Sequence, residues 1–322
     1  MATLLAASAG LAATNLKQEP SLDAGRLAYE ASDYATAIQL LQGAAAKDPR
    51  DGNVQLLLVK SFLELQEHDA AIKSAERAVS IDPRSSVYHE WLGRAYGEKA
   101  DHAAWFSAIS LAKKTGKEFE TAVKLDKRNF AARQALIEFD CSAPGMVGGG
   151  EEKALPQIKE LAELDQAEGH FAKGNCRRQK KDFAAADAEF TQALETNPKS
   201  PELIYDIGDY AVKRGQPERL AAVAKAGESV APTDPRGKFY GAVGLILKNE
   251  EPEEAERRLR EYLKTAPNRS GYPRPATTHA WLGRLFETQG KMEEAAKELE
   301  TALRLDPKNK LAQETLKRLK KG

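Results

Sequence analysis

The sequence is poor in cysteine, and this scarcity excludes two kinds of site. Among 322 residues there are 2 cysteines, Cys141 and Cys176, so both a disulfide framework and the paired spacing of a structural zinc site are ruled out. The two cysteines lie 35 residues apart, which makes a bridge between neighbouring helices conceivable. A disulfide, however, requires the two side chains to meet at a matching height and angle. We therefore expect two free thiols.

Net charge and long apolar runs are also absent. The 48 lysines and arginines are balanced by 48 aspartates and glutamates, so no electrostatic force favours nucleic acid or an anionic membrane as a partner. The apolar run at residues 2–13 has 12 residues, whereas a helix that crosses a bilayer needs about 20. We expect no nucleic-acid partner and no integral membrane span.

Residues 1–17 form a leader that has two interpretations. Its apolar run ends in small residues and is followed by a polar stretch, as in the hydrophobic and cleavage regions of a secretory signal. No lysine or arginine precedes the run, so the charged part of such a signal is missing, and the alternative is a disordered leader. We favour the remnant of a signal peptide. The expected location is therefore periplasmic or exported, and otherwise cytoplasmic.

Motifs of catalysis and metal binding are missing as well. The sequence contains no HExxH, CxxC, GxSxG or aspartate-rich metal loop. Three of its five histidines (His89, His170 and His279) lie four residues before a glycine in one recurring slot, which indicates a structural position rather than a metal site. We expect no enzyme, no cofactor and no metal.

A glycine-rich run, Gly148–Gly150, precedes two glutamates and could open a phosphate-binding helix. The fingerprint is incomplete, because no Gly-Lys-Ser/Thr follows and Glu151 and Glu152 occupy the place of the phosphate. Two carboxylates at this point instead favour a helix N-terminus electrostatically. We interpret the run as a structural turn, with a ligand loop as the alternative.

The sequence is rich in alanine, leucine and charged residues, which is typical of closely packed amphipathic helices. It also repeats. Pro49 and Pro83 each close a similar segment 34 residues apart, as do Pro198 and Pro232. An alanine lies 12 residues before the closing proline in five units, namely Ala37, Ala71, Ala186, Ala255 and Ala295. Such a period indicates stacked helix pairs, each of which buries its apolar face against the next.

The repeat resembles that of the tetratricopeptide-repeat family, most clearly in residues 29–51 and 282–309. The resemblance implies an all-α, right-handed solenoid of about eight helix pairs with a C-terminal capping helix, and an insertion near residues 143–150 is similar to one in exported bacterial proteins. We expect a bacterial repeat protein. The predicted units are 18–51, 52–85, 86–129, 130–166, 167–200, 201–235, 236–275 and 276–309, followed by the capping helix 310–322.

Three units carry extra residues, and the insertion near residues 143–150 belongs to the fourth of the eight. The third has a surplus at 97–117, which predicts either lengthened helices or a long turn, and its Trp105 and Phe106 are expected to be buried against the neighbouring unit. The eighth gains residues at 270–275, where the composition predicts a loop.

In this family the first helices line a concave groove that holds the ligand, and two sets of residues recur there. Arg26, Lys60 and Arg94 occupy one slot of the first three units. They either form a basic groove or are neutralised by glutamates four residues on. The family's carboxylate clamp, which grips chaperone C-termini, has lysine and asparagine where this chain has Leu22 and Arg26, so we expect no such clamp.

The second set is aromatic. Phe171, Tyr205 and Tyr240 share a slot in units five to seven, and Asn175 and Asp209 lie one turn after the first two. They either face a partner or pack between adjacent helices. The favoured function is a non-enzymatic scaffold that binds a protein or peptide. The alternatives are an accessory subunit of a cell-envelope enzyme, or a glycan-binding module in which the aromatic rings stack on sugars.

Overall fold

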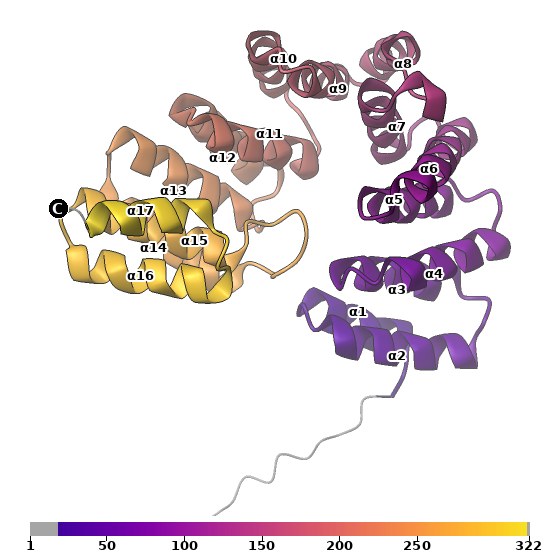
Figure 1. The fold of residues 1–322 in the computed structure, drawn as a ribbon, viewed down its shortest axis with the longest axis horizontal. Coiled ribbons are helices and arrows are strands. Elements are labelled where there is room, and N and C mark those ends of the chain that lie inside the picture. Colours follow the sequence, from indigo (N-terminus) through magenta and orange to yellow (C-terminus); the bar gives the residue numbers. More distant parts are fainter. Residues whose placement is uncertain (1–18, 321–322) are drawn as a thin grey trace, which may run out of the picture.

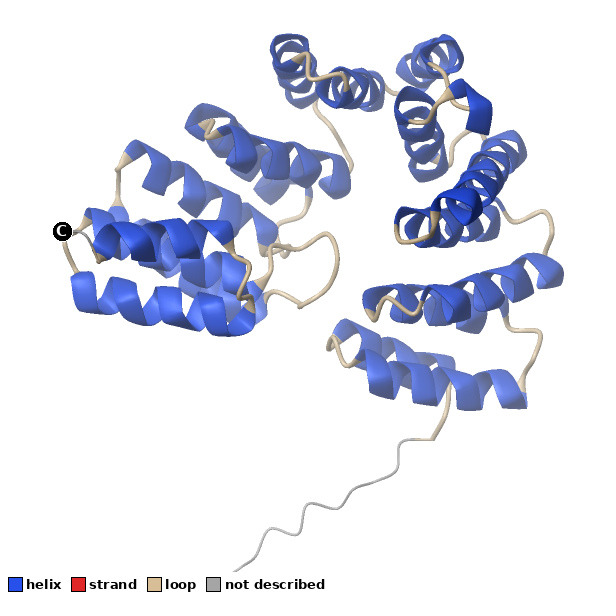
Figure 2. Ribbon diagram, in the orientation of Figure 1, coloured by secondary structure: helices blue, strands red, loops and turns tan. Residues whose placement is uncertain are grey.

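The computed structural model describes residues 19–320, and over that range its regular secondary structure consists of helices joined by turns and loops (Figure 2). The predicted leader at 1–17 and the last two residues of the predicted cap lie outside the described residues. None of the described helices combines the length and the apolar character needed to cross a lipid bilayer. The expected all-α solenoid is confirmed.

The helices form eight successive antiparallel pairs and a final single helix within residues 19–320. The pairs are α1 (Leu22–Glu30) with α2 (Tyr34–Lys47), α3 (Gly52–Glu64) with α4 (His68–Ile81), α5 (Ser86–Asp101) with α6 (Trp105–Leu125), α7 (Phe130–Ser142) with α8 (Glu151–Leu164), α9 (Gln166–Gln179) with α10 (Phe183–Glu195), α11 (Pro201–Arg214) with α12 (Pro217–Val230), α13 (Arg236–Lys248) with α14 (Pro252–Thr265), and α15 (Pro275–Thr288) with α16 (Met292–Leu305); a short 3-10 turn, η1 (Gly145–Val147), precedes α8, and α17 (Lys310–Leu319) ends the array.

Local sequence explains where the pairs begin and end. The aspartate before a closing proline accepts a hydrogen bond from the backbone N–H two residues on, as Asp48 does from Arg50 at 3.0 Å and Asp82 from Arg84 at 2.9 Å. A polar side chain then caps the next helix, for example Ser85, which accepts from the N–H of Tyr88. These caps satisfy amide groups that would otherwise be unpaired at helix ends.

Small residues set the spacing between helices. The five alanines of the recurring slot are fully buried at helix crossings. At Gly208 an added Cβ would lie 2.8 Å from the Tyr240 ring, so only glycine allows that ring to pack against the backbone. The buried residues form a series of apolar clusters along the solenoid, as expected when each pair buries its apolar face against its neighbours.

The solenoid curves until its two ends approach each other (Figure 1). In the pairs α3/α4, α5/α6 and α7/α8 the first helix lies nearer the middle of the curve. The surplus in the third unit lengthens α5 to 16 residues and α6 to 21 rather than forming a long turn. The expectation for Trp105 and Phe106 was wrong, since they are 68% and 86% exposed. Both residues lie in the first turn of α6, which belongs to the extra length of this helix.

The expectation of free thiols was also wrong. Cys141 and Cys176 form a disulfide between α7 and α9, with Cα atoms 5.4 Å apart. Cys141 lies eleven residues after the start of α7 at Phe130, and Cys176 ten residues after the start of α9 at Gln166. Because α7 and α9 are the first helices of adjacent pairs, these positions meet at almost the same height.

The three histidines of the recurring slot make the same contact in three units. Each presents Nδ1 to a glutamate on the second helix of its own pair, at 2.6–2.8 Å. The pairs are His89 with Glu118, His170 with Glu189, and His279 with Glu298. A repeated contact within the helix pair supports a structural role for this slot.

Candidate binding site

A cleft of about 640 Å³ lies on the inner side of the N-terminal units. Its walls come from the first helices α3, α5 and α7, together with two residues, Ser270 and Arg274, from the loop between α14 and α15. The cleft therefore joins segments that are about 200 residues apart in the sequence. Among its lining residues are two members of the basic set, Lys60 and Arg94.

Lys60 and Arg94 flank a tryptophan in this cleft. The ammonium group of Lys60 lies 4.8 Å from the centre of the Trp91 ring, and the guanidinium carbon of Arg94 lies 5.6 Å from it. Cations prefer the negative face of an aromatic ring, so these contacts hold both side chains at the wall of the cleft. The result is an apolar surface bordered by two positive charges.

Charges of both signs lie near Lys60. Burial lowers the pKa of its ammonium group, and nearby guanidinium groups lower it further, while Glu90 opposes them. Those guanidinium groups belong to Arg269, Arg94 and Arg26. Because like charges raise each other's energy, an anion bound among them would be favoured.

The glutamates expected to neutralise the basic set do not do so. Arg94 pairs with Glu90, one turn before it, at 2.9 Å, rather than with Glu98. Glu64 accepts hydrogen bonds from the backbone of Ser270. Within residues 19–320, Lys60 takes part in no ion pair with a carboxylate. Lys60, the middle residue of the predicted basic set, thus has no ion-pair partner in this part of the chain.

The aromatic set lies in the core, so its predicted contact with a partner is corrected. Tyr205 and Tyr240 are each 1% exposed and their rings stack on one another with centroids 5.6 Å apart, while Phe171 packs against Phe190. Tyr205 and Tyr240 face adjacent pairs and Phe171 faces the second helix of its own pair, so the slot is buried between helices. Stacking of these rings on a sugar, which the glycan-binding alternative required, would need the core to open.

The two polar residues beside the aromatic set lie nearer the surface. Asp209 is exposed and accepts a hydrogen bond from the Tyr240 hydroxyl at 2.7 Å, and Asn175 is half-buried. Partial desolvation on this face, with the neighbouring Asp209 carboxylate, raises the pKa of Asp206 to about 6. This part of the predicted groove is therefore acidic rather than aromatic.

Sequence reasoning missed Trp91, Arg269 and Arg274. A signal for Trp91 was present, since it lies three residues before Arg94 and so shares its helix face. No local signal placed the loop arginines beside the first units, because that contact arises from the curvature of the whole array.

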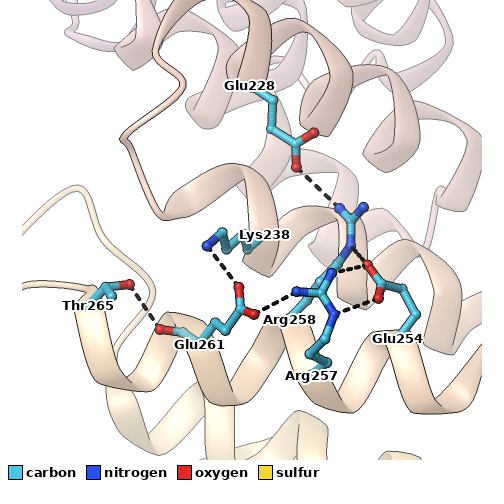
Figure 3. A network of polar contacts seen from close by, with 7 residues as sticks. All are labelled: Glu228, Lys238, Glu254, Arg257, Arg258, Glu261 and Thr265. Atoms are coloured by element: carbon cyan, nitrogen blue, oxygen red, sulfur yellow. Dashed lines mark hydrogen bonds and ion pairs between the residues drawn. The ribbon is translucent and has the colours of Figure 1, made fainter.

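Charged residues on α14 form a network of ion pairs (Figure 3). Arg257 binds Glu254 and Glu261 at 2.6 Å each, and Arg258 reaches from Glu254 to Glu228 on α12. Hydrogen bonds from these arginines lower the pKa of Glu254 to about 2. Charges that are already matched, as on α14, offer little net attraction to a charged ligand.

The glycine-rich run forms a tight turn. Gly148 and Gly150 have φ angles of 102° and 145°, which favour glycine. Their amide groups donate to the carbonyl oxygens of Gly145 and Asp140, at 3.0 and 2.8 Å. Because these N–H groups already have partners in the backbone, the geometry supports the interpretation as a structural turn.

Asp140, beside this turn, gives a prediction about pH. Its side chain is 3% exposed, and burial raises the pKa of its carboxyl group from 3.8 to about 6. An acid with a raised folded-state pKa destabilises the fold increasingly as the pH rises from about 4 to about 6. We expect Asp140→Asn to be more stable than the wild type by about 1–3 kcal/mol at pH 7 and equal to it at pH 4. Denaturant unfolding at both pH values measures this, and an equal difference at the two pH values would contradict it.

Comparison with known proteins identifies the repeat. Profiles described as tetratricopeptide repeat match residues 28–95, 167–200 and 247–310. The chain belongs to the tetratricopeptide-repeat family. The match over 28–95 extends from the end of α1 into α5, and the match over 247–310 includes α14, the loop that reaches the cleft, α15 and α16. The family assignment leaves the bacterial source as a prediction.

Several curated proteins are similar to this tetratricopeptide-repeat chain. Hsp70-Hsp90 organizing protein 1 of Glycine max is 26% identical over 256 residues, covering 76% of this chain and 41% of that protein. Intraflagellar transport protein 70B of Bos taurus is 25% identical over 187 residues, covering 54% of this chain and 25% of that protein. The chain thus spans less than half the length of these relatives.

Solved structures are similar in fold. The Cut9–Hcn1 hetero-tetramer of APC/C matches 92% of this tetratricopeptide-repeat chain and 54% of its own, with a TM-score of 0.50 and 14% identity. A repeat protein from Thermus thermophilus matches 56% of this chain and 92% of its own, with a TM-score of 0.46 and 20% identity. The first of these supports a long helical solenoid.

Proposed function

We propose that the chain is a non-enzymatic scaffold that binds an acidic segment of a protein partner in the cleft of its N-terminal units. One observation carries this proposal: Lys60, without a carboxylate partner among the described residues, lies over Trp91 and among three guanidinium groups. Carboxylates of a peptide would supply the missing negative charge, while Trp91 would contact its apolar atoms. Membership of a repeat family and similarity to Hsp70-Hsp90 organizing protein 1 support a role in protein interaction.

The chaperone C-terminus is not the partner that we propose. Leu22 and Arg26 stand where the family's carboxylate clamp has lysine and asparagine. The positive charge of this cleft comes instead from the second and third units and from the distant loop. An extended peptide with several acidic residues fits such a distributed charge better than a single terminal carboxylate does.

Charge reversal in the cleft tests the proposal. We expect Lys60→Glu/Arg94→Glu to weaken the binding of fluorescein-labelled hexaglutamate at least about tenfold, because each change replaces attraction by repulsion. Fluorescence anisotropy at low and at physiological salt measures the Kd, and the wild-type affinity should fall as salt rises.

The matched control is Lys117→Glu/Lys124→Glu, which makes the same change in net charge on α6, where both lysines are exposed. We expect this control to bind nearly as the wild type does. Equal loss in both double variants would mean that net charge alone governs binding, and the proposed site would be wrong.

We also propose that the protein works in an oxidising compartment outside the cytoplasm. The Cys141–Cys176 bridge supports this location, because disulfides persist in exported proteins and are rare in the reducing cytosol. The chemical state of the two cysteines in protein isolated from its native host tests it: free thiols there would contradict the proposal.

A further inference from the structure

The loop between α14 and α15 crosses to the other end of the molecule (Figure 1). Its Asn268 makes two hydrogen bonds to the turn between α1 and α2. The Tyr34 hydroxyl donates to the Asn268 carbonyl oxygen at 2.8 Å, and the Asn268 N–H donates to Ser32 Oγ at 2.9 Å. These contacts span more than 230 residues of sequence, so they connect the first unit to the start of the last.

A second contact ties the loop to the end of α3. The Ser270 N–H donates to both carboxylate oxygens of Glu64, at 2.9 and 3.1 Å, and Arg274 Nη2 lies 3.8 Å from the same carboxylate. The Glu64 side chain is 6% exposed, so its carboxylate is shielded from water, whereas the Arg274 side chain is 51% exposed. Hydrogen bonds to a shielded carboxylate are stronger than those at an open surface.

The loop is also held from its own side of the molecule. Arg236 donates to the Gly271 carbonyl oxygen at 3.2 Å and lies 4.5 Å over the Tyr272 ring, and the Tyr262 hydroxyl donates to the Pro273 carbonyl oxygen at 2.9 Å. The loop therefore presents a fixed shape to the N-terminal units, which reduces the entropy lost when the two ends meet.

We propose that residues 268–274 are a latch that closes the solenoid into a ring and completes the acidic-peptide cleft. The ligand in this inference rests on the proposed function; the closure itself does not. In the closed ring, Arg274 and Ser270 line the cleft, and Arg269 adds its charge to the cations around Lys60. Opening of the latch would withdraw two guanidinium groups from the ligand.

Closure and binding are then linked. A few hydrogen bonds hold the ends together, and each contributes modestly, so the ring opens by thermal fluctuation. In the empty ring Arg269 of the loop repels Lys60, whereas an acidic peptide between them is attracted to both. A ligand that binds the closed state more tightly shifts the population toward it.

Glu64 and Glu98 provide a test in which the expected effects have opposite signs. Both line the cleft and occupy the same slot of adjacent units, but Glu64 holds the latch, whereas Glu98 makes no latch contact among the described residues. Removal of a carboxylate from the cleft should increase its affinity for an acidic ligand. We therefore expect Glu98→Ala to bind hexaglutamate about twofold to threefold more tightly. We expect Glu64→Ala to bind it about fivefold more weakly, because the latch opens.

Amide hydrogen exchange of the whole chain measures whether the latch is closed, and it requires no ligand. We expect the amides of Asn268 and Ser270 to be protected in the wild type and in Glu98→Ala, and to exchange at least about tenfold faster in Glu64→Ala. Equal exchange in all three proteins would overturn the latch. Tighter binding by Glu64→Ala would overturn its link to the ligand. If hexaglutamate bound none of them, the proposed function would fail, and exchange would still decide the latch.

Discussion

Replacement of Tyr240 by alanine is expected to destabilise the C-terminal half of the solenoid by about 3–5 kcal/mol, which is typical of the loss of a buried aromatic side chain. The ring is 1% exposed, stacks on Tyr205, meets Phe239 edge-on and fills the space left by Gly208. No neighbouring side chain can fill the cavity, because the ring contacts two successive helix pairs. Denaturant unfolding followed by circular dichroism measures the loss.

The conservative variant Tyr240→Phe separates packing from hydrogen bonding. It keeps the ring and removes the bond of 2.7 Å to Asp209, so we expect it to cost about 1 kcal/mol. Burial and the Asp209 carboxylate hold the pKa of this tyrosine well above its ordinary value, so the hydroxyl remains a donor at neutral pH. If Tyr240→Ala were as stable as the wild type, the ring would not be part of the core. The slot would then have to be interpreted again as facing the groove.

Reduction of the Cys141–Cys176 bridge is expected to destabilise the oxidised protein by about 4 kcal/mol. The bridge closes a segment of 35 residues, and a cross-link of this length removes roughly that much conformational entropy from the unfolded chain. Because the bridge joins α7 and α9, the loss falls mainly on the junction of the fourth and fifth units. Unfolding with and without a thiol reductant measures the effect.

The double variant Cys141→Ser/Cys176→Ser is the control for this experiment. We expect its stability to match that of the reduced wild type within about 1 kcal/mol and to be insensitive to the reductant. Labelling of the unreduced, unfolded wild type with a thiol reagent provides a direct check. Two reactive thiols per chain in oxidised protein would contradict the bridge.

Much of the fold followed from local sequence. Each closing proline, buried alanine and capping side chain acts within one helix pair, so the 34-residue spacing that begins at Pro49 and Pro83 predicted a solenoid without reference to distant contacts. The histidine slot was interpreted correctly as structural for the same reason, since its glutamate partner lies on the second helix of the same pair.

Residues whose environment depends on the adjacent pair were harder to place. The slot of Tyr205 and Tyr240 lies on a first helix, and period alone does not tell whether such a slot faces the groove or the neighbouring first helix. Trp105 shows the reverse case: an aromatic residue expected in the core is exposed, because α6 is longer than the other helices. The size of an apolar side chain indicates burial only when a neighbour is there to cover it.

The sequence by itself determined the repeat, the helix pairs and the alanine crossings, because these depend on residues within about 34 positions of one another. Tertiary structure alone decided the disulfide, the cleft and the contact of Glu64 with Ser270. The first depends on the relative height of two helices, and the others on curvature summed over eight pairs. Small rotations at each junction accumulate along a solenoid, so the meeting of its ends is a property of the whole array.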